Sequence, residues 1–146
     1  MMSGRPLIVL DDDPTGAQAV TGVPMLLDWE PEALEWASQT GAPAIHLLTN
    51  TRAFSPGQAY EIVRSGAEAA VVALDRPRLL LRGDSTLRAH LYEEYRAVRD
   101  VAFPGREPVL MLVPALPAAG RITVGGVHLL ETNGDRMPLH ETEYAR

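Results

Sequence analysis

The amino-acid sequence predicts an α/β fold: a mostly parallel, Rossmann-like sheet with helices on both faces, plus a C-terminal β-hairpin appendage. Short apolar runs typical of buried strands alternate with stretches of helical periodicity, as in parallel-sheet proteins. Polar motifs follow four of the apolar runs directly, as expected at the ligand-binding edge of such a sheet. The last part of the chain breaks this pattern, because Gly125-Gly126 separates two segments with the composition of strands.

Five short apolar runs are predicted to form strands. They are residues 6–10, 23–27, 44–48, 79–81 and 109–113. Pro24 lacks a backbone N–H, so the second run suits the start or the edge of a sheet. A first helix is expected over 31–40, with Pro31 in its first turn and Gly41 ending it.

Two further helices and a hairpin complete the expected fold. Ser55, Pro56 and Gln58 have the form of a helix start with a capping box. A third helix is expected to be capped by Asp84 or Ser85. Its apolar stripe is Leu87, Leu91, Tyr95, Val98 and Ala102. After residue 121, Gly125-Gly126 predicts a two-residue hairpin turn, and Asn133-Gly134 marks another turn.

The composition is that of an ordinary globular chain and excludes several classes of protein. Its 146 residues suit one domain, so 1–146 is expected to be a single unit. The net charge of −6 argues against a nucleic-acid surface, and no apolar run has the roughly 20 residues of a membrane helix. Cysteine is absent and the N-terminus lacks signal-peptide features, so a cytoplasmic location is expected. All 13 basic residues are arginine, which excludes a mechanism that depends on a lysine of this chain.

The first polar motif is Asp11-Asp12-Asp13-Pro14-Thr15-Gly16, directly after the first apolar run. Such carboxylates can bind a divalent cation, accept a proton from a substrate hydroxyl, or hydrogen-bond to sugar hydroxyls. The alternative is a solvated turn, because these residues are also good turn formers. The position after a buried strand favours a functional interpretation.

The second motif, Thr49-Asn50-Thr51-Arg52, offers hydroxyls, an amide and a guanidinium. This set suits a polyhydroxylated acid whose carboxylate pairs with Arg52. The alternative is a helix-entry loop in which Asn50 and Thr51 satisfy the backbone.

The third motif runs from Arg82 to His90. Arg82 and Arg88 flank Asp84, so an internal ion pair can orient these side chains. The amides of Ser85 and Thr86 are expected near a helix N-terminus, where anions bind. The alternative is that Asp84 is only a helix cap and the arginines are solvated. The fourth motif, Pro114 to Arg121, taken alone is a connector.

Taken together, these segments resemble the four-carbon acid sugar kinase family, in its N-terminal sugar-binding domain. The resemblance is carried by Leu10 to Gln18, Thr49 to Ala53, Arg82 to Arg88, Pro114 to His128 and Pro138 to Ala145. Their order and spacing together are specific, and they extend over nearly the whole chain. The sequence departs from the family pattern at Ala89, where glycine is common.

The resemblance implies an ATP-dependent kinase that phosphorylates a hydroxyl of a small sugar acid such as threonate or erythronate. In that family the N-terminal domain binds the acid and a separate C-terminal domain binds the nucleotide. Residues 1–146 are therefore expected to be part of a substrate-binding domain, without the nucleotide-binding domain. ATP and magnesium are expected for the complete enzyme, and neither is expected to bind this chain tightly. The expected partners are the sugar acid and a C-terminal domain or separate chain with the nucleotide site. The sequence also allows that the protein forms a homo-oligomer.

The resemblance also assigns roles to residues. The catalytic candidates are Asp12, Asp13 and Asp84, one of which would activate the attacking oxygen. Asp12 and Asp13 would contact sugar hydroxyls. Arg52 and Arg82 would hold the carboxylate of the acid. The predicted substrate-binding residues are Asp12, Asp13, Thr15, Gly16, Asn50, Arg52, Arg82, Asp84, Ser85, Thr86 and Arg88. No metal ligand is predicted.

Two other functions fit parts of the sequence. The first is a haloacid-dehalogenase-like magnesium phosphatase, in which Asp11 would be the nucleophile and Asp13 the acid or base. That mechanism usually requires a lysine, which this chain lacks. The second is a fragment that binds a sugar acid without catalysis, since no phosphate-binding glycine-rich loop is present.

Overall fold

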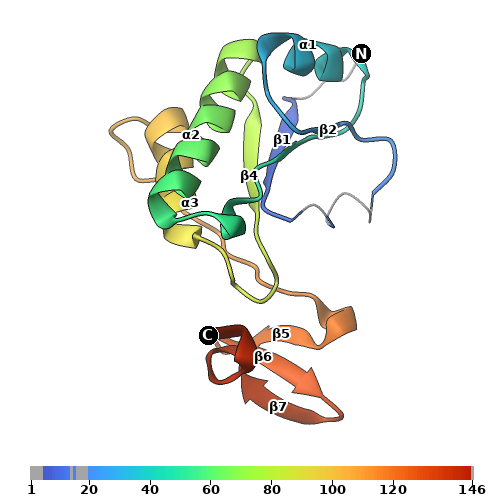
Figure 1. The fold of residues 1–146 in the computed structure, drawn as a ribbon, viewed down its shortest axis with the longest axis vertical. Helices are drawn as coiled ribbons and strands as arrows, with labels where there is room; N and C mark the ends of the chain where they lie inside the picture. The colour runs from blue at the N-terminus through green and yellow to red at the C-terminus, as the bar shows by residue number, and fades with distance from the viewer. Residues whose placement is uncertain (1–4, 14, 16–19, 146) are drawn as a thin grey trace.

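The computed structural model describes residues 5–13, 15 and 20–145, and its main body is built on a four-stranded sheet (Figure 1). The strands are β1 (Leu7–Asp11), β2 (Met25–Leu26), β3 (Ile45–Leu48) and β4 (Arg78–Arg82). They are parallel and lie in the order β2-β3-β1-β4. The predicted α/β class and parallel sheet are confirmed, and the strand after Pro24 lies at the edge, as its missing N–H predicts.

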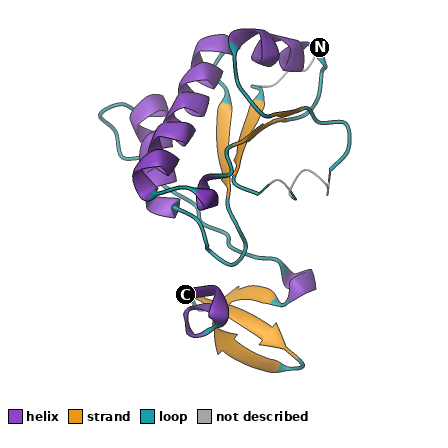
Figure 2. Ribbon diagram, in the orientation of Figure 1, coloured by secondary structure: helices purple, strands orange, loops and turns teal. Residues whose placement is uncertain are grey.

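Three α-helices pack with this sheet: α1 (Pro31–Gln39), α2 (Pro56–Ala73) and α3 (Leu91–Ala102) (Figure 2). Their buried residues join one apolar cluster with alternate residues of the strands. The cluster is Ile8, Leu10, Leu26, Leu34, Ala37, Ile45, Leu47, Val63, Ala67, Ala70 and Ala97. The expectation of helices on both faces is thereby refined, because these helices share one core on one face of the sheet. No α-helix in the described ranges is long and apolar enough to cross a bilayer.

The start of α2 confirms the predicted capping box. The backbone N–H of Ser55 donates to Gln58 Oε1 at 3.1 Å, and Pro56 occupies the first helical position. Gly66 on this helix lies against the sheet, where an added Cβ would approach Leu10 Cδ2 to 3.2 Å. The capping and the close packing fix the direction in which the chain leaves β3, and therefore the loop that carries Arg52.

The strand register brings the polar motifs to one edge of the sheet. Asp11, the last residue of β1, lies between Leu48 of β3 and Arg82 of β4. The segments that follow these three strands therefore begin at the same level. This is the arrangement in which parallel sheets form ligand sites.

The third helix begins later than predicted, at Leu91, so Asp84 and Ser85 do not cap it. Asp84 instead folds its own loop, because its Oδ1 accepts the N–H of Thr86 at 3.2 Å and its carbonyl accepts the N–H of Leu87. Leu87 has a φ of +59°, which a helix cannot contain. The predicted position of the Ser85 and Thr86 amides at a helix N-terminus is therefore wrong, whereas their role in binding an anion stays a prediction.

The predicted strand 109–113 is also wrong, since these residues are extended but pair with no other strand of the described structure. Their side chains are largely exposed, with Val109 at 98% and Met111 at 84%. An apolar run predicts burial, but a strand also needs a hydrogen-bonding neighbour, and β4 does not serve as one here.

The C-terminal part forms a separate antiparallel sheet, as the hairpin signal predicts. It consists of β5 (Arg121–Val124), β6 (Val127–Thr132) and β7 (Asp135–Pro138), in that order. Gly125 and Gly126 have φ values of +58° and +81°, as a two-residue primed turn requires. The predicted turn at Asn133-Gly134 is confirmed as the β6–β7 connection, so the appendage has a third strand that was not predicted.

Candidate functional site

The edge of the sheet at the ends of β1, β3 and β4 carries a connected network of polar side chains. Its first member, Asp11, is fully buried and has both carboxylate oxygens engaged. Arg82 Nη1 lies 3.0 Å from Oδ1, and His46 Nδ1 lies 2.9 Å from Oδ2. Its backbone carbonyl accepts the N–H of Thr49 at 2.9 Å. Asp11 therefore ties three strand ends together and has a structural role.

Asp12 extends the network to the loop after β3. Its Oδ1 accepts the backbone N–H of Arg52 at 2.7 Å and lies 2.9 Å from Thr51 Oγ1. Thr51 Oγ1 in turn lies 2.5 Å from Oε1 of Glu94 on α3. Asp12 is 1% exposed, and its second oxygen, Oδ2, is buried without a hydrogen-bond partner among the described residues.

Asp13 reaches the same loop through the side chain of Arg52. Arg52 Nη2 donates to Asp13 Oδ1 at 2.9 Å, and the N–H of Thr15 donates to the same oxygen. Partial burial raises the pKa of Asp13, but the hydrogen bonds from Thr15 and the charge of Arg52 outweigh burial and leave the pKa below its usual value. Asp13 is therefore a charged acceptor at neutral pH.

Asp84 completes the network from the loop after β4. Arg88 Nε donates to its Oδ2 at 2.7 Å, the hydroxyl of Thr86 bonds to the same oxygen, and Arg52 Nη1 lies 3.9 Å away. Burial raises the pKa of Asp84, yet the bonds from Thr86 and Arg88 more than offset it, so the pKa lies below its usual value. Asp12, Arg52 and Asp84, which come from three separate motifs, thus converge.

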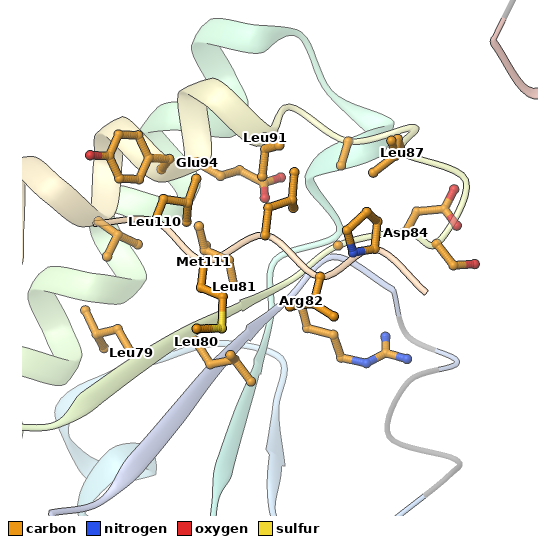
Figure 3. Close-up of a pocket in the computed structure, with 18 of the residues that line it drawn as sticks. Leu79, Leu80, Leu81, Arg82, Asp84, Leu87, Leu91, Glu94, Leu110 and Met111 are labelled. Carbon is orange, nitrogen blue, oxygen red and sulfur yellow. The ribbon is translucent and has the colours of Figure 1, made fainter. Parts of the chain in front are cut away.

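A cavity of about 840 Å³ opens beside this network, between β4, α3 and the extended segment 108–116 (Figure 3). Figure 3 shows Arg82 and Asp84 at one end of the cavity, with Leu79, Leu80 and Leu110 at the other. Asp13, Thr15 and Ser85 also line it. The polar end offers carboxylate and guanidinium groups that suit a small hydroxylated acid, whereas the rest of the lining is largely apolar.

The remaining predicted site residues lie close by but differ in what they do. Asn50 has a left-handed φ of +48°, and its N–H points to the carbonyl of Asp11 at 3.4 Å. The Ser85 carbonyl lies 2.8 Å from Nε2 of His128 on β6, which joins the appendage to the site. Gly16 lies outside the described residues.

The predicted pairing of the arginines is only half correct. Arg88 forms the expected ion pair with Asp84, whereas Arg82 pairs with Asp11 instead. Within the described part of the chain, Arg52 and Arg88 are the arginines in contact with the Asp84 carboxylate. Arg82 nevertheless lines the cavity, whereas Arg52 and Arg88 contact the carboxylates at its polar end.

Two buried residues of the network were not predicted from the sequence. His46 was assigned only to a strand, although period-two alternation places it on the face that also carries Asp11. Glu94 falls three residues after Leu91 and four before Val98, so helical spacing puts it on the apolar stripe of α3. A carboxylate on a predicted apolar stripe was the available signal. Burial, followed by the nearby charge of Asp12, raises the pKa of Glu94, against a lowering hydrogen bond from Thr51.

The geometry speaks against the phosphatase alternative. A nucleophilic Asp11 would need an exposed oxygen, but this side chain is fully buried and both of its oxygens are hydrogen-bonded. Among the described residues, no group of three or more His, Asp and Glu side chains is placed to hold a metal ion.

Comparison with known proteins identifies the family of the chain. A family model described as "Sugar-binding N-terminal domain" matches residues 7–146. The chain is 35% identical over 150 residues to a D-erythronate kinase of Heliobacterium modesticaldum. The match covers 96% of this chain but 32% of that kinase, so the chain spans about a third of the length of its relative. The chain therefore belongs to the family of sugar-binding N-terminal domains, the four-carbon acid sugar kinase family that its motifs resemble.

Proposed function

We propose that this chain is the acid-binding part of an ATP-dependent kinase that phosphorylates a hydroxyl of a four-carbon sugar acid, of the erythronate or threonate type. The observation that carries the proposal is the polar end of one cavity, which Asp13, Arg82 and Asp84 line and where Arg52 is held between the two carboxylates. Carboxylates accept hydrogen bonds from the hydroxyls of such an acid, and guanidinium groups bind its carboxylate.

The contacts suggest how the acid is held. Arg88 donates from Nε to Asp84 Oδ2 and thereby orients a carboxylate that lines the cavity. Arg52 is held between Asp13 and Asp84, which fixes its direction. Arg82 lines the same cavity, so Arg52 and Arg82, the pair that the resemblance implies, are the proposed acid clamp.

The carboxylates divide into two groups by access. Asp13 and Asp84 line the cavity, whereas Asp12 is buried behind Arg52 and Thr51. Asp13 or Asp84 is therefore the candidate that orients the attacking hydroxyl, and both are ionised at neutral pH. Phosphoryl transfer depends mainly on positioning and charge neutralisation, so an ionised acceptor suffices for this role.

The nucleotide is assigned to a partner region. The matched kinase is about three times as long as this chain, which agrees with a C-terminal domain, or a separate chain, that binds ATP and magnesium. Both cofactors remain predictions for the complete enzyme.

Calorimetry tests the proposal directly. This chain is titrated with D-erythronate, with erythritol, which has the hydroxyls but no carboxylate, and with MgATP. Binding of the acid but not of erythritol is expected, and Arg88→Gln should weaken it. Arg64→Gln is the matched control, since among the residues that the structure describes Arg64 pairs with Glu61 and Glu68 on the exposed side of α2. Tight binding of MgATP without binding of the acid would contradict the proposal.

A further inference from the structure

Glu94, Thr51 and Asp12 are linked by two short contacts between oxygens. If both carboxyls are ionised, one hydrogen is missing for these two contacts to be hydrogen bonds. Thr51 Oγ1 lies 2.5 Å from Glu94 Oε1 and 2.9 Å from Asp12 Oδ1. A hydroxyl has a single proton to donate, but it can also accept. Both short contacts are hydrogen bonds only if one carboxyl supplies a proton to Thr51.

Glu94 is the carboxyl that fits this role. Asp12 Oδ1 already accepts the backbone N–H of Arg52 at 2.7 Å, so this oxygen acts as an acceptor in the network. Glu94 is 3% exposed, on the apolar stripe of α3, and has no arginine partner among the described ion pairs. The 2.5 Å separation is that of an O–H group bonded to an oxygen.

We propose that Glu94 is a positioning residue held as a neutral carboxylic acid. Its O–H donates to Thr51, and the Thr51 hydroxyl then donates to Asp12. Asp12 in turn accepts the backbone N–H of Arg52 and fixes the position of that loop. The two carboxyls together then carry one negative charge, and it lies on Asp12. The relay runs from α3 to the loop after β3. Its protonation pattern does not depend on the proposed function, whereas its effect on acid binding through Arg52 rests on it.

The surroundings of Glu94 are consistent with this assignment. The titratable groups that act on its charge most are Asp12, at the end of β1, and His90, at the start of α3. Asp13, Arg82 and Asp84 line the same cavity as Glu94. Burial and the neighbouring Asp12 raise the pKa of Glu94.

Infrared spectroscopy of the wild-type chain at pH 7 is the first test. A carbonyl band of a protonated carboxylic acid is expected, and ¹³C-labelled glutamate should shift it. The band should be missing in Glu94→Gln and retained in Glu93→Gln, the matched change at the adjacent position. A wild-type spectrum without such a band overturns the proposal, whether or not the variant folds.

Urea unfolding as a function of pH is the second test. Above the ordinary glutamate pKa of 4.5, the folded wild type keeps a proton that the unfolded chain loses. Its stability therefore falls as pH rises toward the raised folded pKa, and the unfolding constant increases about tenfold per pH unit relative to Glu94→Gln. Glu93→Gln should follow the wild type. Parallel curves for the wild type and Glu94→Gln would overturn the proposal.

The positioning role has its own readout. Glu94→Gln retains a donor for Thr51 and should bind erythronate within about threefold of the wild type, whereas Glu94→Ala should lose about tenfold or more, one hydrogen bond's worth. Equal losses in both variants would refute positioning through the donor. If the wild type binds no erythronate, the proposed function fails, but the infrared and unfolding results still decide the protonation of Glu94.

Discussion

Thr51→Val isolates the energetic value of the buried relay. Valine retains the shape of threonine but has no hydroxyl, so Glu94 Oε1 loses its bond to Thr51 and Asp12 Oδ1 keeps only the N–H of Arg52. A buried polar group left without a partner costs about 1–3 kcal/mol, and the weaker loss at Asp12 adds about 1 kcal/mol. The free energy of unfolding should therefore fall by about 2–4 kcal/mol, a large share of the stability of a small domain.

Thr51→Ser is the matched control, because it keeps the hydroxyl and removes only a methyl group, at a cost of about 1 kcal/mol. Equilibrium urea unfolding at pH 7, followed by far-UV circular dichroism, gives both values if the m-values agree with the wild type. A Thr51→Val chain as stable as Thr51→Ser would show that the hydroxyl contributes nothing, and the reasoning about the relay would be wrong.

Three further predictions concern the appendage and the acid clamp. Gly120→Ala should disrupt the C-terminal sheet, since the new Cβ would lie 2.1 Å from the Glu131 carbonyl oxygen. Gly126→Ala, also at positive φ but in open space, should reduce the free energy of unfolding by only about 1–2 kcal/mol. The dispersion of the NMR amide signals of the sheet distinguishes the two variants. Asp84→Asn should destabilise the chain more at pH 7 than at pH 3. The lowered pKa of Asp84 stabilises the fold above the ordinary value of 3.8, and this stabilisation is lost as pH falls through the folded pKa. Urea unfolding that shows no such difference would contradict the ion-pair assignment. Arg52→Gln should weaken erythronate binding about tenfold or more in calorimetry, since a charge-assisted hydrogen bond is worth about 1.5–3 kcal/mol, and unchanged affinity would remove Arg52 from the clamp.

The sequence predicted the features that have local signals. The capping box at Ser55 and the turns at Gly125-Gly126 and Asn133-Gly134 need only a few adjacent residues, and each is present. The convergence of Asp12, Arg52 and Asp84 was predictable because the ends of neighbouring parallel strands share an edge.

Other features depend on contacts between distant segments and were missed. The pairing of His46 with Asp11 needs the order of β3 and β1 in the sheet, which periodicity does not reveal. The late start of α3 follows from Asp84 binding its own loop instead of a helix end, and the same residue type serves both purposes. The sequence also could not show which arginine pairs with Asp84, because Arg82 and Arg88 both lie close to it along the chain.

The unpaired segment 109–113 has a practical consequence for handling the protein. Its five residues, Val-Leu-Met-Leu-Val, contain no charge, proline or glycine. Among the described strands, β4 beside the cavity has a neighbour on one side only. Apolar, uncharged segments of this kind next to an unpaired strand edge promote aggregation. Solubility of the purified chain should therefore be limited by this stretch, and a single charged substitution at Met111, whose side chain is 84% exposed, should improve it.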